Sequence, residues 1–371
     1  MHKGMYAQGP IVATAVPVGI EGHSQPIQAA PHFNQYINEP VYDGVNEPAI
    51  RDFLSANKWP IGLQDTFINN AKQIAMRFVI CDDSGSMSEA DGHLPLAHKH
   101  SPACTRWEEL TDSLRFMLQA AKAADIVTEF RLLNAVEPIR IGADNDPDNV
   151  GFNLLMRVFD EQPRGGTPLC RHIKAIIETV RGMEAQLRST RQRACVVICT
   201  DGVSSDGDLI AAMKPLEALP VWVVIKVCTD DDAIVNYWND LDSRLEVEID
   251  VLDDFISEAA EVYAANPWLT YGLQLHRMRE FGLPSKEFDI LDSGQLSPGQ
   301  MRSLVAALLG GTPHDYPEPT QHFNDFSAAV QHRLQHSATT KDPNRNLREM
   351  PWIDLRMLSK KYNPKAGCQI S

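Results

Sequence analysis

Short, nearly continuous apolar runs alternate with amphipathic stretches between residues 76 and 265. Runs of this kind are typical of strands that are buried on both faces of a sheet. Intervening stretches repeat apolar residues at helical spacing, as Leu169, Ile173 and Ile176 do. We expect strands at 76–82, 127–133, 139–142, 193–200, 221–228 and 245–252, and helices at 104–124, 149–162, 168–189, 206–218, 234–243 and 254–265. The alternation predicts an α/β fold, a doubly wound, mostly parallel sheet with helices on both faces.

The segments outside this region differ in composition. Residues 1–45 are rich in Pro, Ala, Gln and Gly and carry few charges, which predicts a disordered arm. Residues 46–74 read as a helical lead-in that Trp59-Pro60 interrupts. Residues 266–311 predict a small helical appendage, with helices at 268–282 and 297–310. Residues 312–371, where Pro, His and polar residues dominate, predict a mobile tail with one helix at 323–336.

The bulk properties exclude several classes of protein. A formal net charge of −15 argues against general nucleic-acid binding, which needs a basic face. No apolar run reaches the roughly eighteen residues of a spanning helix, and Pro17 and Gly19 interrupt the early stretch that could resemble a signal segment. The seven cysteines form no CxxC pair, and several lie in apolar runs. We therefore expect a reduced, cytosolic chain.

Oxygen-bearing side chains follow two of the expected strands and precede one helix. Asp82, Ser84 and Ser86 come after the first strand, and Asp201 comes after the strand at 193–200. Thr167, in RGGTPL, stands just before the helix at 168–189. Ligands gather at the carboxyl ends of the strands in a doubly wound sheet, so these residues can meet at one edge. Oxygen ligands alone select a hard cation, here Mg²⁺ or Mn²⁺.

The pattern DxSxS…T…D, with its GGTPL and TDG contexts, resembles the von Willebrand factor A (vWA) domain and its metal-ion-dependent adhesion site (MIDAS) over residues 75–265. The resemblance implies that Ser84, Ser86 and Thr167 ligate the metal directly, while Asp82 and Asp201 support it. Neutral hydroxyls leave the ion's charge largely unquenched, so an open position can take the acidic side chain of a protein partner. This implies a non-enzymatic, Mg-dependent protein-interaction module.

One residue departs from the family pattern. Position 83 is Asp, where many relatives have a small or neutral residue. A carboxylate facing the ion would make the site less avid for an acidic partner. Alternation along the loop predicts that the Asp83 side chain points away from the ion.

The chain ends in CQIS, a C-a-a-X pattern that predicts farnesylation of Cys368. One lipid chain binds membranes weakly, and a basic patch is the usual second signal. The residues before the cysteine supply such a patch, formed by Arg356, Lys360, Lys361 and Lys365. We therefore expect a cytoplasmic protein, peripheral on the cytosolic face of a membrane.

Two alternatives stay open. A metal-dependent hydrolase would use the same cation, but the sequence has no P-loop or nucleophile elbow, and its histidines cluster away from the metal motifs. A soluble cytosolic scaffold without a lipid anchor would make the CQIS ending accidental.

The insert after the first metal loop carries His93, His98, His100 and Cys104. Their spacing fits no structural zinc template, so we interpret the insert as a solvated loop. The acidic run that begins at Asp230 reads as a solvated turn that adds negative charge near the same sheet edge.

Overall fold

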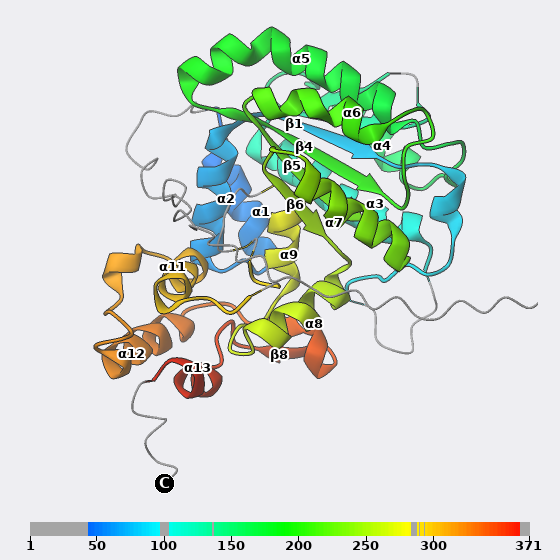
Figure 1. The fold of residues 1–371 in the computed structure, drawn as a ribbon. Helices are drawn as coiled ribbons and strands as arrows, with labels where there is room; N and C mark the ends of the chain where they lie inside the picture. The colour runs from blue at the N-terminus through cyan, green and yellow to red at the C-terminus, as the bar shows by residue number, and fades with distance from the viewer. Residues whose placement is uncertain are drawn as a thin grey trace, which may run out of the picture. The chain divides into compact units, whose positions relative to one another are not determined.

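A six-stranded sheet forms the centre of the protein (Figure 1). The computed structural model describes residues 44–96, 104–135, 137–282, 288, 290–292 and 294–363. The strands are β1 (Ile74–Cys81), β2 (Thr128–Leu132), β3 (Ile139–Ile141), β4 (Arg193–Thr200), β5 (Val221–Val227) and β6 (Ile249–Leu252). Their order is β3-β2-β1-β4-β5-β6, and every neighbouring pair is parallel except β2 and β3. The predicted doubly wound, mostly parallel sheet is confirmed.

Helices cover both faces of the sheet. One face packs against α5 (Leu169–Thr190), α6 (Leu209–Met213) and α7 (Asp232–Arg244), and the other against α3 (Arg106–Ala124), α4 (Val150–Val158), α8 (Phe255–Ala265) and α9 (Leu273–Glu280). Successive side chains of a strand point to opposite faces. In β4, Val196 and Ile198 accordingly join the core beside α5, whereas Val197 and Cys199 join the core beside α3. This two-sided burial explains the continuous apolar runs.

The lead-in and the appendage pack against each other. The lead-in forms α1 (Glu47–Ala56) and α2 (Ile61–Gln73), and the appendage contributes α11 (Pro298–Leu309). A β-carbon at Gly62 would lie 2.2 Å from the backbone nitrogen of Gly310, so only glycine permits this close approach. The Thr66 hydroxyl also donates to the carbonyl of Ala307, at 3.1 Å. The described residues also form short 3-10 helices: η2 (Gly85–Ser88), η3 (Lys214–Ala218), η4 (Pro313–Asp315) and η5 (Pro343–Arg345).

The described part of the expected mobile tail, residues 312–363, is folded. It contains α12 (Phe323–Leu334), the antiparallel pair β7 (Thr340–Asp342) and β8 (Arg348–Met350), and α13 (Leu355–Tyr362). Tyr316, Phe326 and Trp352 are fully buried. The backbone nitrogen of Thr270 donates to the Trp352 carbonyl at 2.9 Å, which ties the segment to the residues before α9. A few widely spaced aromatic residues anchor it, and they leave no periodic pattern in the sequence.

Some sequence predictions fall outside the described residues. Residues 1–43 of the expected N-terminal arm, and Lys365 and Cys368 of the expected lipidation segment, are among them. Among the helices that the structure does describe, none combines the length and apolarity that a membrane crossing requires.

Candidate metal centre

The centre lies where the strand order reverses. The chain passes from β1 to β2 on one side of the sheet and then returns to β4 on the other side of β1. The carboxyl ends of β1 and β4 therefore flank the crevice in which doubly wound folds bind their ligands. The backbone nitrogen of Asp82 donates to the carbonyl of Cys199 at 3.0 Å, so the loops after the two strands start side by side.

Asp82 braces the loop that follows β1. Its side chain is fully buried. One carboxylate oxygen accepts from the Ser84 backbone nitrogen at 3.0 Å, and the other accepts from the Thr200 hydroxyl at 2.6 Å. Burial raises the pKa of Asp82 to about 6, because the charged form loses water that these hydrogen bonds replace only in part. Asp82 thus connects the loop after β1 to the end of β4.

Three oxygens form a row beside this brace. The Ser84 and Ser86 hydroxyl oxygens lie 3.1 Å apart, and the Ser86 hydroxyl donates to Oδ1 of Asp201 at 3.0 Å. An octahedral Mg²⁺ with bonds of 2.0–2.1 Å places adjacent ligand oxygens about 3.0 Å apart. The row (Ser84, Ser86 and Asp201, called the oxygen row below) therefore has the spacing and the donor chemistry that fit a small hard cation.

Thr167 lies in a loop that backbone hydrogen bonds join to its neighbours. The Gly85 nitrogen donates to the Gly165 carbonyl at 3.1 Å, which joins this loop to the loop after β1. The Thr167 nitrogen donates to the Ser205 hydroxyl at 3.2 Å, and the Ser205 nitrogen donates to the Thr167 carbonyl at 2.8 Å. The Thr167 side chain is half-buried. The structure thus joins four predicted residues directly, and Gly165 joins the loop of the fifth to the loop after β1.

Asn134, which sequence reasoning missed, holds the Asp83 side chain. The carboxylate of Asp83 accepts from the backbone and side-chain nitrogens of Asn134, both at 2.9 Å. The Asn134 side chain also donates to the Gly166 carbonyl at 3.0 Å. Gly165 has a φ of +104°, and a β-carbon there would lie 2.3 Å from the Asn134 side-chain oxygen. Asp83 and Asn134 together connect three loops, and the Asp83 carboxylate faces the nitrogens of Asn134.

A guanidinium stands against the oxygen row. Arg106, the first residue of α3, donates from Nη1 to Oδ2 of Asp201 at 2.9 Å. Its other nitrogens donate to both carboxylate oxygens of Asp91, each at 2.6 Å. The hydrogen bonds that Arg106 donates to Asp91 and Asp201 hold the pKa of Arg106 above its ordinary value. A fixed positive charge thus adjoins the predicted cation site.

His172 is a histidine that lies nearer to the site than the sequence indicated. It belongs to the first turn of α5 and lies close enough to Asp83 to interact with its charge, although burial outweighs this and raises the pKa of Asp83. Its Nε2 lies 3.1 Å from the carbonyl oxygen of Leu133, and burial lowers its pKa. The ring is therefore engaged with the backbone at the end of β2.

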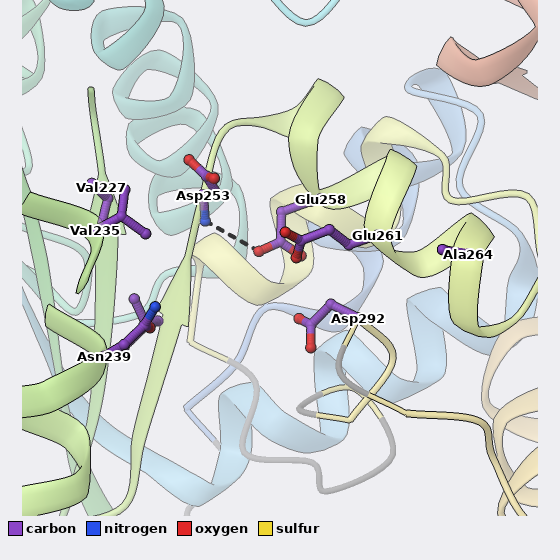
Figure 2. Close-up of a pocket in the computed structure, with 9 residues that line it drawn as sticks. Val227, Val235, Asn239, Asp253, Glu258, Glu261, Ala264 and Asp292 are labelled. Atoms are coloured by element: carbon purple, nitrogen blue, oxygen red, sulfur yellow. Dashed lines mark hydrogen bonds between the residues drawn. The ribbon is translucent and has the colours of Figure 1, made fainter. Parts of the chain in front are cut away.

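Away from the oxygen row, a hollow of about 500 Å³ opens beside β6 and α8 and is strongly acidic. Asp253, Glu258, Glu261 and Asp292 line it (Figure 2). Behind it, the buried guanidinium of Arg279 is shared by Glu258 at 2.5 Å, Asp292 at 2.9 Å and Asp250 at 3.1 Å. Burial raises the pKa of Glu258 to about 8, since one guanidinium cannot compensate three carboxylates.

Neither a protein-family model nor a curated protein sequence matches the chain. Among solved structures, it is similar to the SpRpn10 VWA domain, with 14% identity over 48% of this chain and 88% of that chain and a TM-score of 0.33. It is also similar to the conserved hypothetical protein BatB from Bacteroides thetaiotaomicron, with 11% identity over 55% of this chain and 96% of that chain and a TM-score of 0.35. A third similar structure is the manganese-loaded TRAP protein of Plasmodium vivax, with 14% identity over 49% of this chain and 69% of that chain and a TM-score of 0.29.

Hydroxyl and carboxylate oxygens converge at the switch point, and Asp201 balances part of its charge against Arg106. Of the residues that sequence reasoning missed, Thr200 precedes Asp201 directly and could have been inspected with it. Asn134 and Arg106 reach the site only through the packing of distant segments.

Proposed function

We propose that this protein is a Mg²⁺-dependent protein-interaction module that binds an acidic side chain of its partner through the metal. Ser84, Ser86 and Thr167 supply direct ligands, and Asp82 and Asp201 support them. The oxygen row carries the proposal, because the Ser84 and Ser86 hydroxyl oxygens, 3.1 Å apart, match adjacent ligand positions of an octahedral cation, and Asp201 accepts a hydrogen bond from Ser86 at 3.0 Å. Mn²⁺, with similar oxygen preference, would serve as a substitute.

The charges around the row support an acidic partner. All three proposed direct ligands, Ser84, Ser86 and Thr167, are neutral hydroxyls, so the ion keeps most of its charge. Arg106 already opposes the charge of Asp201. Ser86, in the middle of the oxygen row, is exposed, whereas Ser84 is buried. A partner can therefore reach the row at Ser86. A carboxylate arriving there would meet a cation that the protein has not neutralised.

The metal is tested first, by titrating the full chain with Mg²⁺ in a calorimeter. Ser86→Ala removes a proposed ligand from the centre of the oxygen row, and we expect its Mg²⁺ affinity to fall at least about tenfold. Ser88→Ala, an exposed serine of the same turn outside the row, is the matched control. Wild-type affinity in Ser86→Ala would exclude the proposed site.

The chemistry of the partner is tested with two immobilised peptide pools. One pool carries Asp and Glu, and the other carries Asn and Gln at the same positions. We expect the protein to be retained on the acidic pool in the presence of Mg²⁺ and released by a chelator. Ser86→Ala should not be retained, while Ser88→Ala should behave as wild type. Retention that persists in excess chelator would contradict metal-mediated capture, even if Mg²⁺ binding itself is confirmed.

We further propose that a prenyl group on Cys368 and the basic residues before it hold the module at the cytosolic face of a membrane. What supports the electrostatic part is that Arg356, Lys360 and Lys361 are exposed on α13, whose Leu358 is buried. Cys368→Ser should shift a tagged protein from the membrane fraction to the supernatant. An unchanged distribution would leave the soluble scaffold as the better interpretation.

A further inference from the structure

A buried carboxylate oxygen without a hydrogen-bond partner lies at the same sheet edge. Asp254 follows β6 and caps α8, where its Oδ1 accepts from the backbone nitrogens of Ile256 at 2.7 Å and Ser257 at 3.2 Å. Its Oδ2 has no hydrogen-bond partner, although the residue is only 4% exposed. An unsatisfied buried oxygen destabilises the folded protein, and more so when it is charged. A cation held beside Asp254 would engage this atom.

Two side chains from other loops surround this oxygen. The Nδ1 atom of His93 lies 4.0 Å from Oδ2 of Asp254 and 3.6 Å from Oδ1 of Asp230. One ligand atom from each of the three residues lies within 4.8 Å of the other two. His93 belongs to the insert after the loop of β1, and Asp230 follows β5. Three loops thus present one nitrogen and two oxygens to a common point.

An imidazolium alone does not satisfy the two carboxylates. At 3.6 and 4.0 Å, neither contact of Nδ1 is a hydrogen bond. Ligands of a tetrahedral metal ion with bonds of 2.0–2.2 Å lie about 3.4 Å apart. Small rotations of the three side chains would therefore place them around an ion, whereas the present spacing is too wide for hydrogen bonds between them.

The backbone holds His93 in this position. The backbone nitrogen of His93 donates to the Glu109 carboxylate at 2.8 Å. Glu109 is buried and pairs with the buried Lys226 at 3.3 Å. The preceding Gly92 forms an antiparallel bridge with Cys104. A β-carbon at Gly92 would lie 2.4 Å from the Thr105 carbonyl oxygen, so the strand-like approach requires glycine. His93 is therefore directed toward the end of β5 and β6 by a fixed support.

We propose that His93, Asp230 and Asp254 form a second divalent-cation site, one for a first-row transition ion such as Zn²⁺. An imidazole nitrogen combined with two carboxylates favours such ions over Mg²⁺, which prefers oxygen alone. The His93 and Asp230 side chains are 43% and 54% exposed, so water or a partner's ligand can complete the coordination. The site uses none of the five residues of the proposed Mg²⁺ site.

The test is a Zn²⁺ titration of the full chain by calorimetry, with Mg²⁺ in excess to occupy the first site. His332 on α12 and His336 in the turn after it are exposed, have ring centroids 5.3 Å apart and can bind a transition ion by themselves. Both are therefore replaced by Ala in every protein that is compared. We expect His93→Gln and Asp230→Asn each to weaken Zn²⁺ binding at least about tenfold. Asp231→Asn, an exposed neighbour outside the cluster, should bind as the parent does.

A second measurement keeps the test independent of folding defects. Asp254→Asn retains an oxygen that can cap α8 but removes the charge, and circular dichroism checks that the variant is folded. Zn²⁺ should raise the Tm of the parent and leave that of Asp254→Asn unchanged. Equal Zn²⁺ affinity in the parent, His93→Gln and Asp230→Asn, or equal Tm shifts in the parent and Asp254→Asn, would overturn the proposal.

Discussion

The fixed charge of Arg106 gives the most quantitative test of the proposed Mg²⁺ site. Replacing it by Gln keeps a hydrogen-bond donor for Asp201 but removes the positive charge. The guanidinium lies 2.9 Å from Oδ2 of Asp201, while Ser86 donates to Oδ1 of the same carboxylate at 3.0 Å. We expect Arg106→Gln to bind Mg²⁺ more tightly than wild type, because a repulsion between like charges disappears.

The magnitude follows from that geometry. An ion bound to the Ser86 hydroxyl would lie roughly 6 Å from the guanidinium, given metal–oxygen bonds of about 2.1 Å. Repulsion between a unit charge and a double charge at this distance is about 1.4 kcal/mol with the dielectric constant of water and about 5.5 kcal/mol with an effective value near 20. The lower figure corresponds to a tenfold gain in affinity. Asp91 and Asp201, freed from Arg106, would add attraction in the same direction.

The assay is Mg²⁺ calorimetry at an ionic strength of about 0.01 M, where screening over a few ångströms is small. Arg115→Gln is the matched control, since Arg115 also lies on α3 and pairs with Asp160 at 2.6 Å. The gain should shrink as salt is added, because screening weakens the repulsion. An unchanged or reduced affinity in a folded Arg106→Gln protein would refute the placement of the ion beside Asp201.

Three further predictions concern stability. Native Glu258, with its pKa raised to about 8, keeps its proton at pH values where the unfolded chain has lost it. The free energy of unfolding should therefore fall as the pH rises from about 4.5 to 8, by up to about 1.4 kcal/mol per pH unit. Glu258→Gln should flatten this slope when unfolding is followed in urea at several pH values. Gly165→Ala should cost about 1–3 kcal/mol, because it strains a positive φ and displaces Asn134; a urea midpoint equal to wild type would contradict this. Trp352→Ala should cost about 3–5 kcal/mol if the C-terminal segment is part of the core, and an unchanged Tm would show that it is not.

Apolar patterning predicted the sheet well because its central strands are buried on both faces. The run at 221–228 corresponds to β5 (Val221–Val227), and the run at 193–200 to β4 (Arg193–Thr200). The edge strand β6 was predicted at 245–252 but spans only Ile249–Leu252. Leu245 is buried against the core beside α7 without joining the sheet, so its apolar character extended the predicted strand.

The C-terminal segment escaped prediction for a different physical reason. It is stabilised by single aromatic residues, each of which fills a site built by another part of the chain. Tyr316 donates its hydroxyl to the Gly310 carbonyl at 2.9 Å, and the Trp352 carbonyl accepts from Thr270 at 2.9 Å. Periodicity detects a helix or strand that buries a whole face. It does not detect isolated anchors in a segment of mainly polar residues.

The candidate sites show which parts of a centre a sequence can disclose. Ser84 and Ser86 share one short loop, so their pattern is visible; Arg106 meets Asp201 only because α3 begins at the edge where β4 ends. The strand order shows why acidic residues from distant segments meet at one edge of the sheet. Four consecutive parallel strands of the sheet, β1, β4, β5 and β6, are followed by aspartates, at Asp82, Asp201, Asp230 and Asp254. Because these carboxyl ends share one edge, their negative charges accumulate there and need compensating cations. The charge of Arg106 meets part of that need, and bound metal ions at the two proposed sites would meet the rest, which makes the two metal titrations tests of a single electrostatic argument.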